Sequence, residues 1–235
     1  MSVAERLGAV RARLSAAASA CGRNASEITL VAVSKFHPPS ALEEAYAAGQ
    51  RVFGENRVQE AEEKKAALAH LMDGPDPLRL ELIGALQSNK ARKAVAAVSR
   101  IQSIDSADLG ARVGRIAAEM GRTLPVFVEV DLAGEATKAG VPEADLTPCL
   151  ETLARVEGLK VEGLMAIPPF LENPEDVRPY FRRLRELRDA SHARGLLAGR
   201  ELSMGMSHDF EVAIAEGATV VRVGTAIFGE RPVRG

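Results

Sequence analysis

The chain has 235 residues, of which 46% are hydrophobic, 26% are charged and 4% are aromatic. This apolar content is ordinary for a globular protein and sufficient for a substantial core. The formal net charge of -2 gives no electrostatic reason to expect nucleic acid or an acidic membrane as a partner.

The few cysteines and histidines exclude the common structural metal and disulfide frameworks. Cys21 and Cys149 are far apart in the sequence, and the histidines share no metal-ligand spacing. No run approaches the roughly 18 apolar residues of a membrane span. Segment 1–22 has acidic and basic residues scattered through it, unlike a signal peptide. We therefore expect a soluble, cytoplasmic protein without a metal site.

The predicted elements alternate along the chain. An amphipathic N-terminal helix comes first, with an apolar stripe at Val3, Leu7, Val10, Leu14, Ala17 and Cys21. Short runs rich in β-branched residues predict eight strands at residues 28–34, 51–53, 78–83, 100–104, 125–130, 161–167, 201–204 and 219–223. Helical stretches are predicted at residues 40–48, 56–71, 88–98, 107–120, 143–156, 178–193 and 208–216.

This alternation predicts an α/β fold with parallel strands and right-handed crossovers. Eight such units in a chain of this length match a (β/α)8 TIM barrel, which typically has ~250 residues. The extra N-terminal helix would cover its bottom or side. A doubly wound open sheet is the alternative, because periodicity alone does not separate the two. No linker, low-complexity stretch or repeat divides the sequence, so residues 1–235 are expected to form a single domain.

A lysine follows the most hydrophobic predicted strand. Pro38 and Pro39 stop that strand soon after Lys35, and the active face of a barrel lies at the carboxyl ends of its strands. Apolar neighbours would lower the pKa of Lys35, because desolvation disfavours the ammonium, and a neutral amine can form a Schiff base with a carbonyl. Alternatively, Lys35 extends into solvent or pairs with Glu55 or Glu129.

Two other lysines are rivals for this role. Lys90 begins a helical stretch with several cations, and Lys138 lies in a glycine-flanked loop. Neither ends an apolar strand, so both are more typical of solvated positions.

The loops after the last two predicted strands, SMGMSHD and VGTAIFG, have the composition of an anion site. Barrels often bind phosphate here with backbone N–H groups and a short helix. Ser207 is expected at the N-cap of the next helix, Gly224 allows close backbone approach, Thr225 offers a hydroxyl and Arg222 offers a fixed positive charge. Each residue alone also fits a purely structural role, but both loops together favour phosphate. A phosphate-bearing carbonyl compound, either pyridoxal 5′-phosphate or a phosphosugar, would use both this site and Lys35.

The motifs AVSKFHP, FGENRVQE, IGALQSNK, GLMAIPP and SMGMSHDFEVAIAEGATVVRVGTAIFG together resemble the YggS/PROSC family of pyridoxal phosphate homeostasis proteins. The resemblance covers nearly the whole chain. It implies a barrel like the N-terminal domain of alanine racemase, and pyridoxal 5′-phosphate held covalently as an aldimine on the lysine that corresponds to Lys35. The cofactor-binding residues that we expect are Lys35, Asn56, Met206, Ser207, Arg222, Gly224 and Thr225, with Arg222 at either the phosphate or the pyridine edge.

Some positions depart from the family pattern. Glu81 stands in a run where an aromatic, a histidine and an aromatic are common, Arg57 follows GEN where tyrosine is frequent, and Asp131 replaces a common asparagine. These changes put any family-wide role of those side chains in doubt and leave the lysine and phosphate clusters unchanged.

The resemblance to racemases does not imply racemase activity, which needs a second acid/base group, usually a tyrosine from an additional β-domain. The sequence ends soon after its eighth predicted strand, so no such domain is expected, and Tyr46 and Tyr180 fall in or beside helices. We expect a monomeric, non-catalytic protein that holds pyridoxal phosphate and passes it to apoenzymes, without nucleic acid or membrane partners. The alternatives are a pyridoxal-phosphate enzyme of narrow amino-acid specificity and a Schiff-base phosphosugar aldolase.

Overall fold

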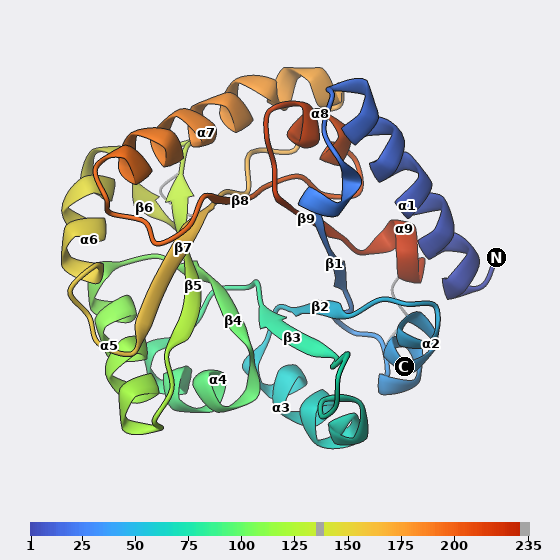
Figure 1. The fold of residues 1–235 in the computed structure, drawn as a ribbon, viewed down its shortest axis with the longest axis horizontal. Helices are drawn as coiled ribbons and strands as arrows, with labels where there is room; N and C mark the ends of the chain where they lie inside the picture. Colours follow the sequence, from blue (N-terminus) through green and yellow to red (C-terminus); the bar gives the residue numbers. More distant parts are fainter. Residues whose placement is uncertain (135–138, 231–235) are drawn as a thin grey trace.

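The computed structural model describes residues 1–134 and 139–230. In this part of the chain, eight parallel strands form a closed barrel with helices around it (Figure 1). The strand order is β4-β3-β2-β1-β9-β8-β7-β5, and the pairing of β4 with β5 closes the ring. The predicted (β/α)8 barrel is therefore confirmed, and the open-sheet alternative is wrong. The strands of the ring are β1 Thr29–Val33, β2 Val52–Glu55, β3 Arg79–Leu82, β4 Arg100–Ile104, β5 Leu124–Asp131, β7 Leu159–Met165, β8 Glu201–Ser203 and β9 Val220–Val223.

All eight predicted strands are found, with shifts at their ends. Strand β2 continues to Glu55 because Gly54 and Glu55 pair in register with Glu81 and Leu82 of β3, which a strand's own sequence does not reveal. An additional two-residue strand, β6 Val141–Pro142, pairs with β5 and was not predicted.

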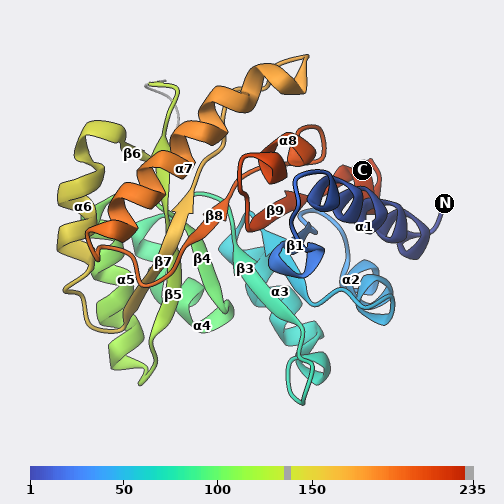
Figure 2. The ribbon, with the colours of Figure 1, turned by 45° about the horizontal axis from the view of Figure 1, so that its top comes forward.

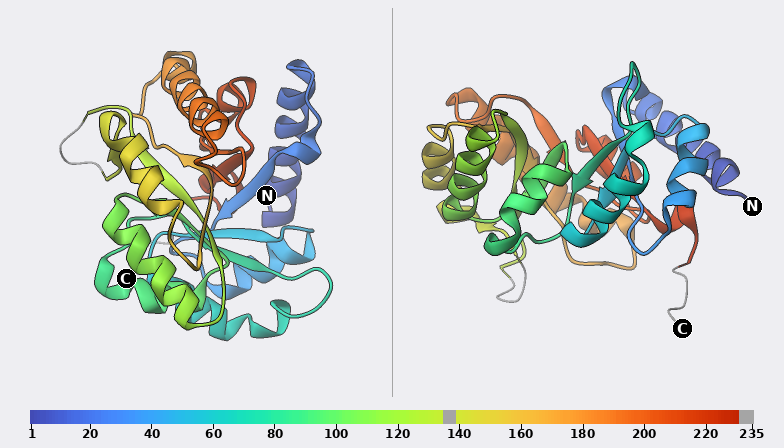
Figure 3. Two further views of the ribbon diagram at one scale, coloured as in Figure 1. Left: turned by 60° about the vertical axis from the view of Figure 1, so that its left-hand side comes forward. Right: turned by 90° about the horizontal axis from the view of Figure 1, so that it is seen from below.

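The helices are shorter than the sequence suggests, because several begin or end in 3₁₀ turns. The α-helices are α1 Val3–Ala20, α2 Pro39–Ala47, α3 Val58–Ala67, α4 Ala91–Ala97, α5 Ala107–Glu119, α6 Leu146–Leu153, α7 Arg178–Ala193, α8 Phe210–Ala215 and α9 Thr225–Phe228. The 3₁₀ turns are η1 Ala25–Glu27, η2 Ala69–Leu71, η3 Ser88–Lys90, η4 Glu143–Asp145 and η5 Pro174–Val177. Figure 3 shows the ring of helices from two further sides. None of the helices in the described part of the chain has both the length and the apolarity needed to cross a membrane.

Helix α1 packs against α2, α8 and α9 on the side of the barrel (Figure 2). Its buried stripe ends at Ala18, whereas Ala17 is only partly buried and Cys21 is exposed. The prediction of those two positions is wrong because a helix with 3.6 residues per turn returns to the face of Leu14 four residues later. Ser2 and Glu5 form a capping box at the start of the helix.

The barrel has a large core outside the strands and a smaller mixed interior. The core between strands and helices is mainly aliphatic, with Phe53, Phe181, Phe210 and Phe228 among its members. Inside the ring, an apolar cluster consists of Val31, Val52, Phe127, Met165 and Val220. The buried polar residues on the strands include Glu81, Gln102, Glu129, Ser203 and Arg222. Buried polar groups are costly unless they are hydrogen-bonded, and four of these five, Glu81, Gln102, Ser203 and Arg222, are joined by hydrogen bonds.

Candidate functional site

One pocket at the carboxyl ends of the strands contains all seven predicted site residues. Its volume is about 720 Å³, and its wall includes Lys35, Asn56, Met206, Ser207, Arg222, Gly224 and Thr225. Parallel strands in a closed ring bring their carboxyl ends to one mouth, so residues almost the whole chain apart become neighbours. The structure thus places these residues together, and their roles as cofactor contacts stay a prediction.

Lys35 lies just beyond β1 and is half-buried at the pocket. The next residue, Phe36, has a φ of 68° and is the only non-glycine residue with a positive φ in the described part of the chain. Such a conformation costs of order 1–3 kcal/mol and persists only where the surrounding structure holds it. The Phe36 N–H donates to Glu60 Oε2 at 2.9 Å. The turn that presents Lys35 is therefore held at a free-energy cost.

Of the residues proposed from the sequence as rivals or partners of Lys35, one lines the pocket and the others do not or are not described. Lys90 is in η3 and is not among the residues that line this pocket. Lys138 lies outside the described residues. Glu55 forms a buried ion pair with Lys64, and Glu129 is itself part of the pocket wall.

The loops after β8 and β9 form a cluster of donors at the pocket. Ser207 Oγ accepts hydrogen bonds from the Gly224 N–H at 3.3 Å and from Thr225 Oγ1 at 3.4 Å, and α9 begins at Thr225. A Cβ on Gly224 would lie 3.3 Å from Cβ and O of Val33, so a larger residue would disturb this contact between β1 and the loop. Hydroxyl and N–H donors at a helix start suit a phosphate dianion.

The prediction that Ser207 caps the next helix is wrong. Helix α8 begins at Phe210, and Asp209 occupies the N-cap position. Asp209 Oδ1 accepts from the Met206 N–H at 2.6 Å, which tightens the loop into a turn before the helix starts. Ser207 is therefore displaced from the cap and directed to the loop after β9, where its hydroxyl meets Gly224.

Arg222 reaches the pocket from β9 but is separate from this donor cluster. Only 4% of it is exposed, and its guanidinium donates to Ser203 Oγ and, at 3.0 Å, to the Ala166 carbonyl. Burial lowers the pKa of Arg222 to about 10, against the opposing effects of Glu129 and Asp209. At neutral pH it is a fixed cation in the pocket floor.

The sequence did not predict the polar residues that support Arg222. Ser203 Oγ donates to Gln102 Oε1 at 2.6 Å, and Gln102 Nε2 donates to Glu81 Oε2. Arg100 donates to the other oxygen of Glu81 at 3.0 Å. Glu81, the departure from the family pattern, is thus one end of a hydrogen-bonded chain across the barrel interior. The sequence did contain a sign of this chain of hydrogen bonds: polar residues stand within the predicted strands RIQSI and ELS.

Glu129 is a titratable carboxyl group in the pocket wall. Only 7% of the residue is exposed, and burial raises its pKa to about 7, with Asp105 and Asp131 adding to the rise and Arg222 opposing it. The sequence suggested Glu129 only as a partner for Lys35. Its environment instead makes it an acid or base near neutral pH.

Glu129 is expected to make the protein less stable as the pH rises from 5 to 8. The folded state holds the extra proton, so this stabilising contribution is complete below the ordinary pKa of 4.5 and is lost as the pH rises through about 7. At ~1.4 kcal/mol per pKa unit, the loss is about 3 kcal/mol at most. Urea unfolding at both pH values measures it, with Glu129→Gln as the variant that cannot ionise. An equal loss in the variant would show that other groups cause the dependence.

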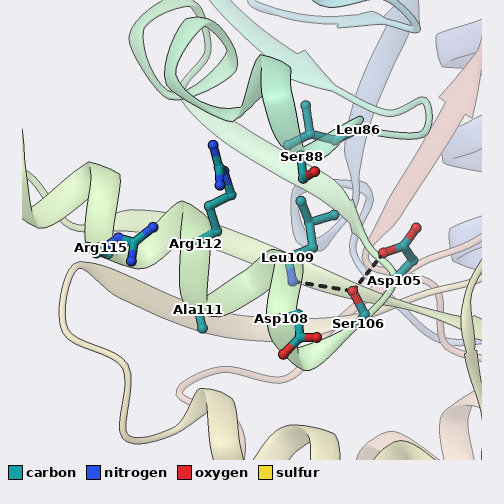
Figure 4. Close-up of a pocket in the computed structure, with 9 residues that line it drawn as sticks. All are labelled: Leu86, Ser88, Asp105, Ser106, Asp108, Leu109, Ala111, Arg112 and Arg115. Carbon is teal, nitrogen blue, oxygen red and sulfur yellow. Dashed lines mark hydrogen bonds between the residues drawn. The ribbon is translucent and has the colours of Figure 1, made fainter.

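A second pocket lies between η3 and α5 (Figure 4) and shares none of its lining residues with the first. Its wall mixes acidic and basic side chains, including Asp105, Asp108 and Arg112. Ser106 Oγ accepts from the Leu109 N–H and is the N-cap of α5. Ordinary helix capping explains this cluster, and we assign it no ligand.

Fold and site together define the class of protein: a (β/α)8 barrel with a lysine and a cluster of hydroxyl and N–H donors at one mouth. The family model for the N-terminal domain of alanine racemase matches residues 6–232. The chain is 46% identical to the "Pyridoxal phosphate homeostasis protein" of Aquifex aeolicus, over 98% of this chain and 99% of that protein. It is 40% identical to the protein of the same name from Escherichia coli K12, over 97% of each. The chain belongs to the family of pyridoxal phosphate homeostasis proteins.

Solved structures agree with this assignment. PipY of Synechococcus elongatus with PLP bound matches with a TM-score of 0.84 and 43% identity, over 97% of this chain and all of that one. Alanine racemase from Corynebacterium glutamicum matches with a TM-score of 0.71 and 18% identity, and this chain covers 63% of it. At that identity the likeness shows the fold alone. The predicted resemblance and the alanine-racemase type of barrel are both confirmed.

Proposed function

We propose that the protein binds pyridoxal 5′-phosphate and acts in the homeostasis of this cofactor, without catalysing a reaction of its own. The observation that supports this most directly is the single pocket that combines Lys35 with the donor cluster of Ser207, Gly224 and Thr225. An amine and an anion site in one pocket match the two ends of a phosphorylated aldehyde. The names of the relatives and the PLP-bound PipY structure point to the same ligand.

In this proposal each part of the cofactor meets a different group of the pocket. Lys35 Nζ adds to the aldehyde carbon, a C=N bond forms, and the aldehyde oxygen leaves as water, which gives an aldimine. The phosphate lies at the start of α9 against Ser207, Gly224 and Thr225. Arg222, held in the floor by Ser203 and the Ala166 carbonyl, faces the pyridine edge instead. Asn56 and Met206 complete the wall.

Holding rather than turnover is supported by the relatives' names and by the place of the tyrosines. Tyr46 lies in α2 and Tyr180 in α7, and neither lines the pocket, so no tyrosine is available as the second acid/base group of a racemase. The alternative is an enzyme of narrow amino-acid specificity. Glu129 favours it, because its pKa of about 7 suits proton transfer.

The proposal extends to delivery and to the cellular setting. The pocket is open at its rim, where Ile167 and Phe170 are exposed, and such a rim would let a recipient apoenzyme approach the cofactor. Cys21 and Cys149 are free thiols, which fits the reducing cytoplasm. We further propose that the chain works as one unit, residues 1–235, and as a monomer.

The test is the visible absorption spectrum of the purified protein with pyridoxal phosphate, before and after borohydride, with the modified lysine mapped by mass spectrometry. An imine band that borohydride removes, with the label on Lys35, is the expected result. Addition of amino acids to the loaded protein then separates the two readings, because a carrier shows no product and an enzyme does. A colourless protein that stays unlabelled would overturn the proposal and favour a phosphosugar ligand.

A further inference from the structure

A second lysine lies buried behind the turn that carries Lys35. Lys64 of α3 is 5% exposed, and its ammonium forms an ion pair with Glu55 and donates to the Ser34 carbonyl at 2.7 Å. Ser34 Oγ donates to the same Glu55 oxygen. The end of β1, the end of β2 and the middle of α3 are thus joined in one cluster.

This cluster is a poor device for stabilising the fold. Two charges lose their hydration, and replacing such a pair with apolar residues is often neutral or stabilising. Burial raises the pKa of Glu55 although Lys64 and Ser34 oppose the rise, and Glu55 Oε2 is buried without a hydrogen-bond partner among the described residues. Because the buried pair does little for stability, we look for its role in the place that it occupies in the fold.

The position of the cluster indicates that role. Lys64 binds the carbonyl of Ser34, which belongs to the peptide group before Lys35. Glu60, one turn earlier on the same helix, accepts from the N–H of Phe36, which belongs to the peptide group after Lys35. Both peptide planes that flank the Lys35 Cα are therefore held by α3, and with them the direction of its Cα–Cβ bond. The positive φ of Phe36 shows that the turn does not adopt this shape by default.

We propose that Glu60 and Lys64, together with Glu55, are positioning residues that aim the Lys35 amine into the pocket. The inference rests on the proposed function, in which that amine reacts with an aldehyde. Reactive groups gain rate and equilibrium advantage from such prior orientation. Neither residue of α3 lines the pocket itself, so both act through the backbone of the turn.

Two ligands distinguish positioning of the Lys35 amine from a general effect on the shape of the pocket. Pyridoxal 5′-phosphate reports imine formation, whereas pyridoxine 5′-phosphate has an alcohol in place of the aldehyde and reports the pocket alone. The double variant Glu55→Gln with Lys64→Met removes both buried charges while keeping the side-chain shapes. We expect its imine equilibrium constant and rate to fall about tenfold, with the Kd for pyridoxine phosphate within about twofold of the unmodified protein. Lys65→Met, at the next position of α3 and exposed, is the matched control and leaves both values unchanged.

Glu60→Ala tests the other peptide group and leaves both members of the buried pair in place, with Glu63→Ala as its control on the same helix. We expect Glu60→Ala alone to weaken imine formation, and this variant decides the question if the double variant does not fold. Imine formation within about twofold of the unmodified protein in both test variants would overturn the inference, and so would an equal loss of both ligands. Absence of an imine in the unmodified protein would instead show that the proposed function itself has failed.

Discussion

Replacing Lys35 with alanine is expected to abolish the imine band that pyridoxal phosphate forms with the protein while the barrel stays folded. Lys35 is half-buried at the pocket and lies beyond the end of β1, so its replacement removes no side chain from the strands of the ring. The donors at Ser207, Gly224 and Thr225 remain, and the cofactor is expected to bind through its phosphate with a weaker Kd. Absorption titration measures the band, and thermal unfolding measures the fold.

Lys90→Ala is the control for this variant, because Lys90 is the rival lysine from the connection that follows β3 but lies outside the pocket. Its spectrum should match that of the unmodified protein. An imine band that persists in Lys35→Ala would refute the assignment of Lys35, and loss of the band in Lys90→Ala instead would transfer the role to that lysine.

Replacing Lys64 alone with methionine is expected to cause the largest loss of stability. Glu55 is fully buried and would be left without its cation, a change that typically costs about 3–5 kcal/mol. The second substitution, Glu55→Gln, should then recover most of this loss, because the uncompensated charge disappears with it. Urea unfolding of the two variants and of Lys65→Met gives the comparison.

The decisive result is whether the double variant has a higher free energy of unfolding than Lys64→Met alone. If the single and the double variant were equally destabilised, Lys64 would matter through packing of its alkyl chain and not through its charge. Acid pH offers a second check, because protonation of Glu55 relieves the single variant and should narrow its difference from the double variant.

Much of the barrel was predictable because most of its strands are short runs rich in β-branched and aliphatic residues, each next to a helical pattern. Strand β6 and the one-turn helix α9 were missed because each is too short to have a period of its own. The 3₁₀ turns η2, η3 and η4 lie within segments whose composition is helical. Packing against the barrel decides where these segments change between α-helix and 3₁₀ helix, and local propensity does not encode that packing.

The residues predicted for the site lie in one pocket because strand ends are recognisable in sequence and meet at one mouth. The residues behind them were not predictable in the same way. Gln102 and Ser203 look like isolated polar letters until the ring closes and places them beside Arg222. Likewise, the pKa of Glu129 rises mainly because folding buries it, and Asp105, just beyond β4, adds to the rise. Both properties come from long-range contacts, which a linear pattern does not contain.

The pairing of β1 with β9 has a consequence for the synthesis of the protein. Thr29 pairs with Val220 and Ala32 with Val223, so the first and the last strands of the ring are neighbours. Lys35 is synthesised early, whereas Gly224 and Thr225 are synthesised only after the other strands of the barrel. A nascent chain therefore exposes the Lys35 amine long before it has the donor cluster of Ser207, Gly224 and Thr225 or a closed ring. Under the proposed function, the aldehyde and the phosphate of the cofactor would be held together only after translation has passed β9, so cofactor loading would require the closed ring.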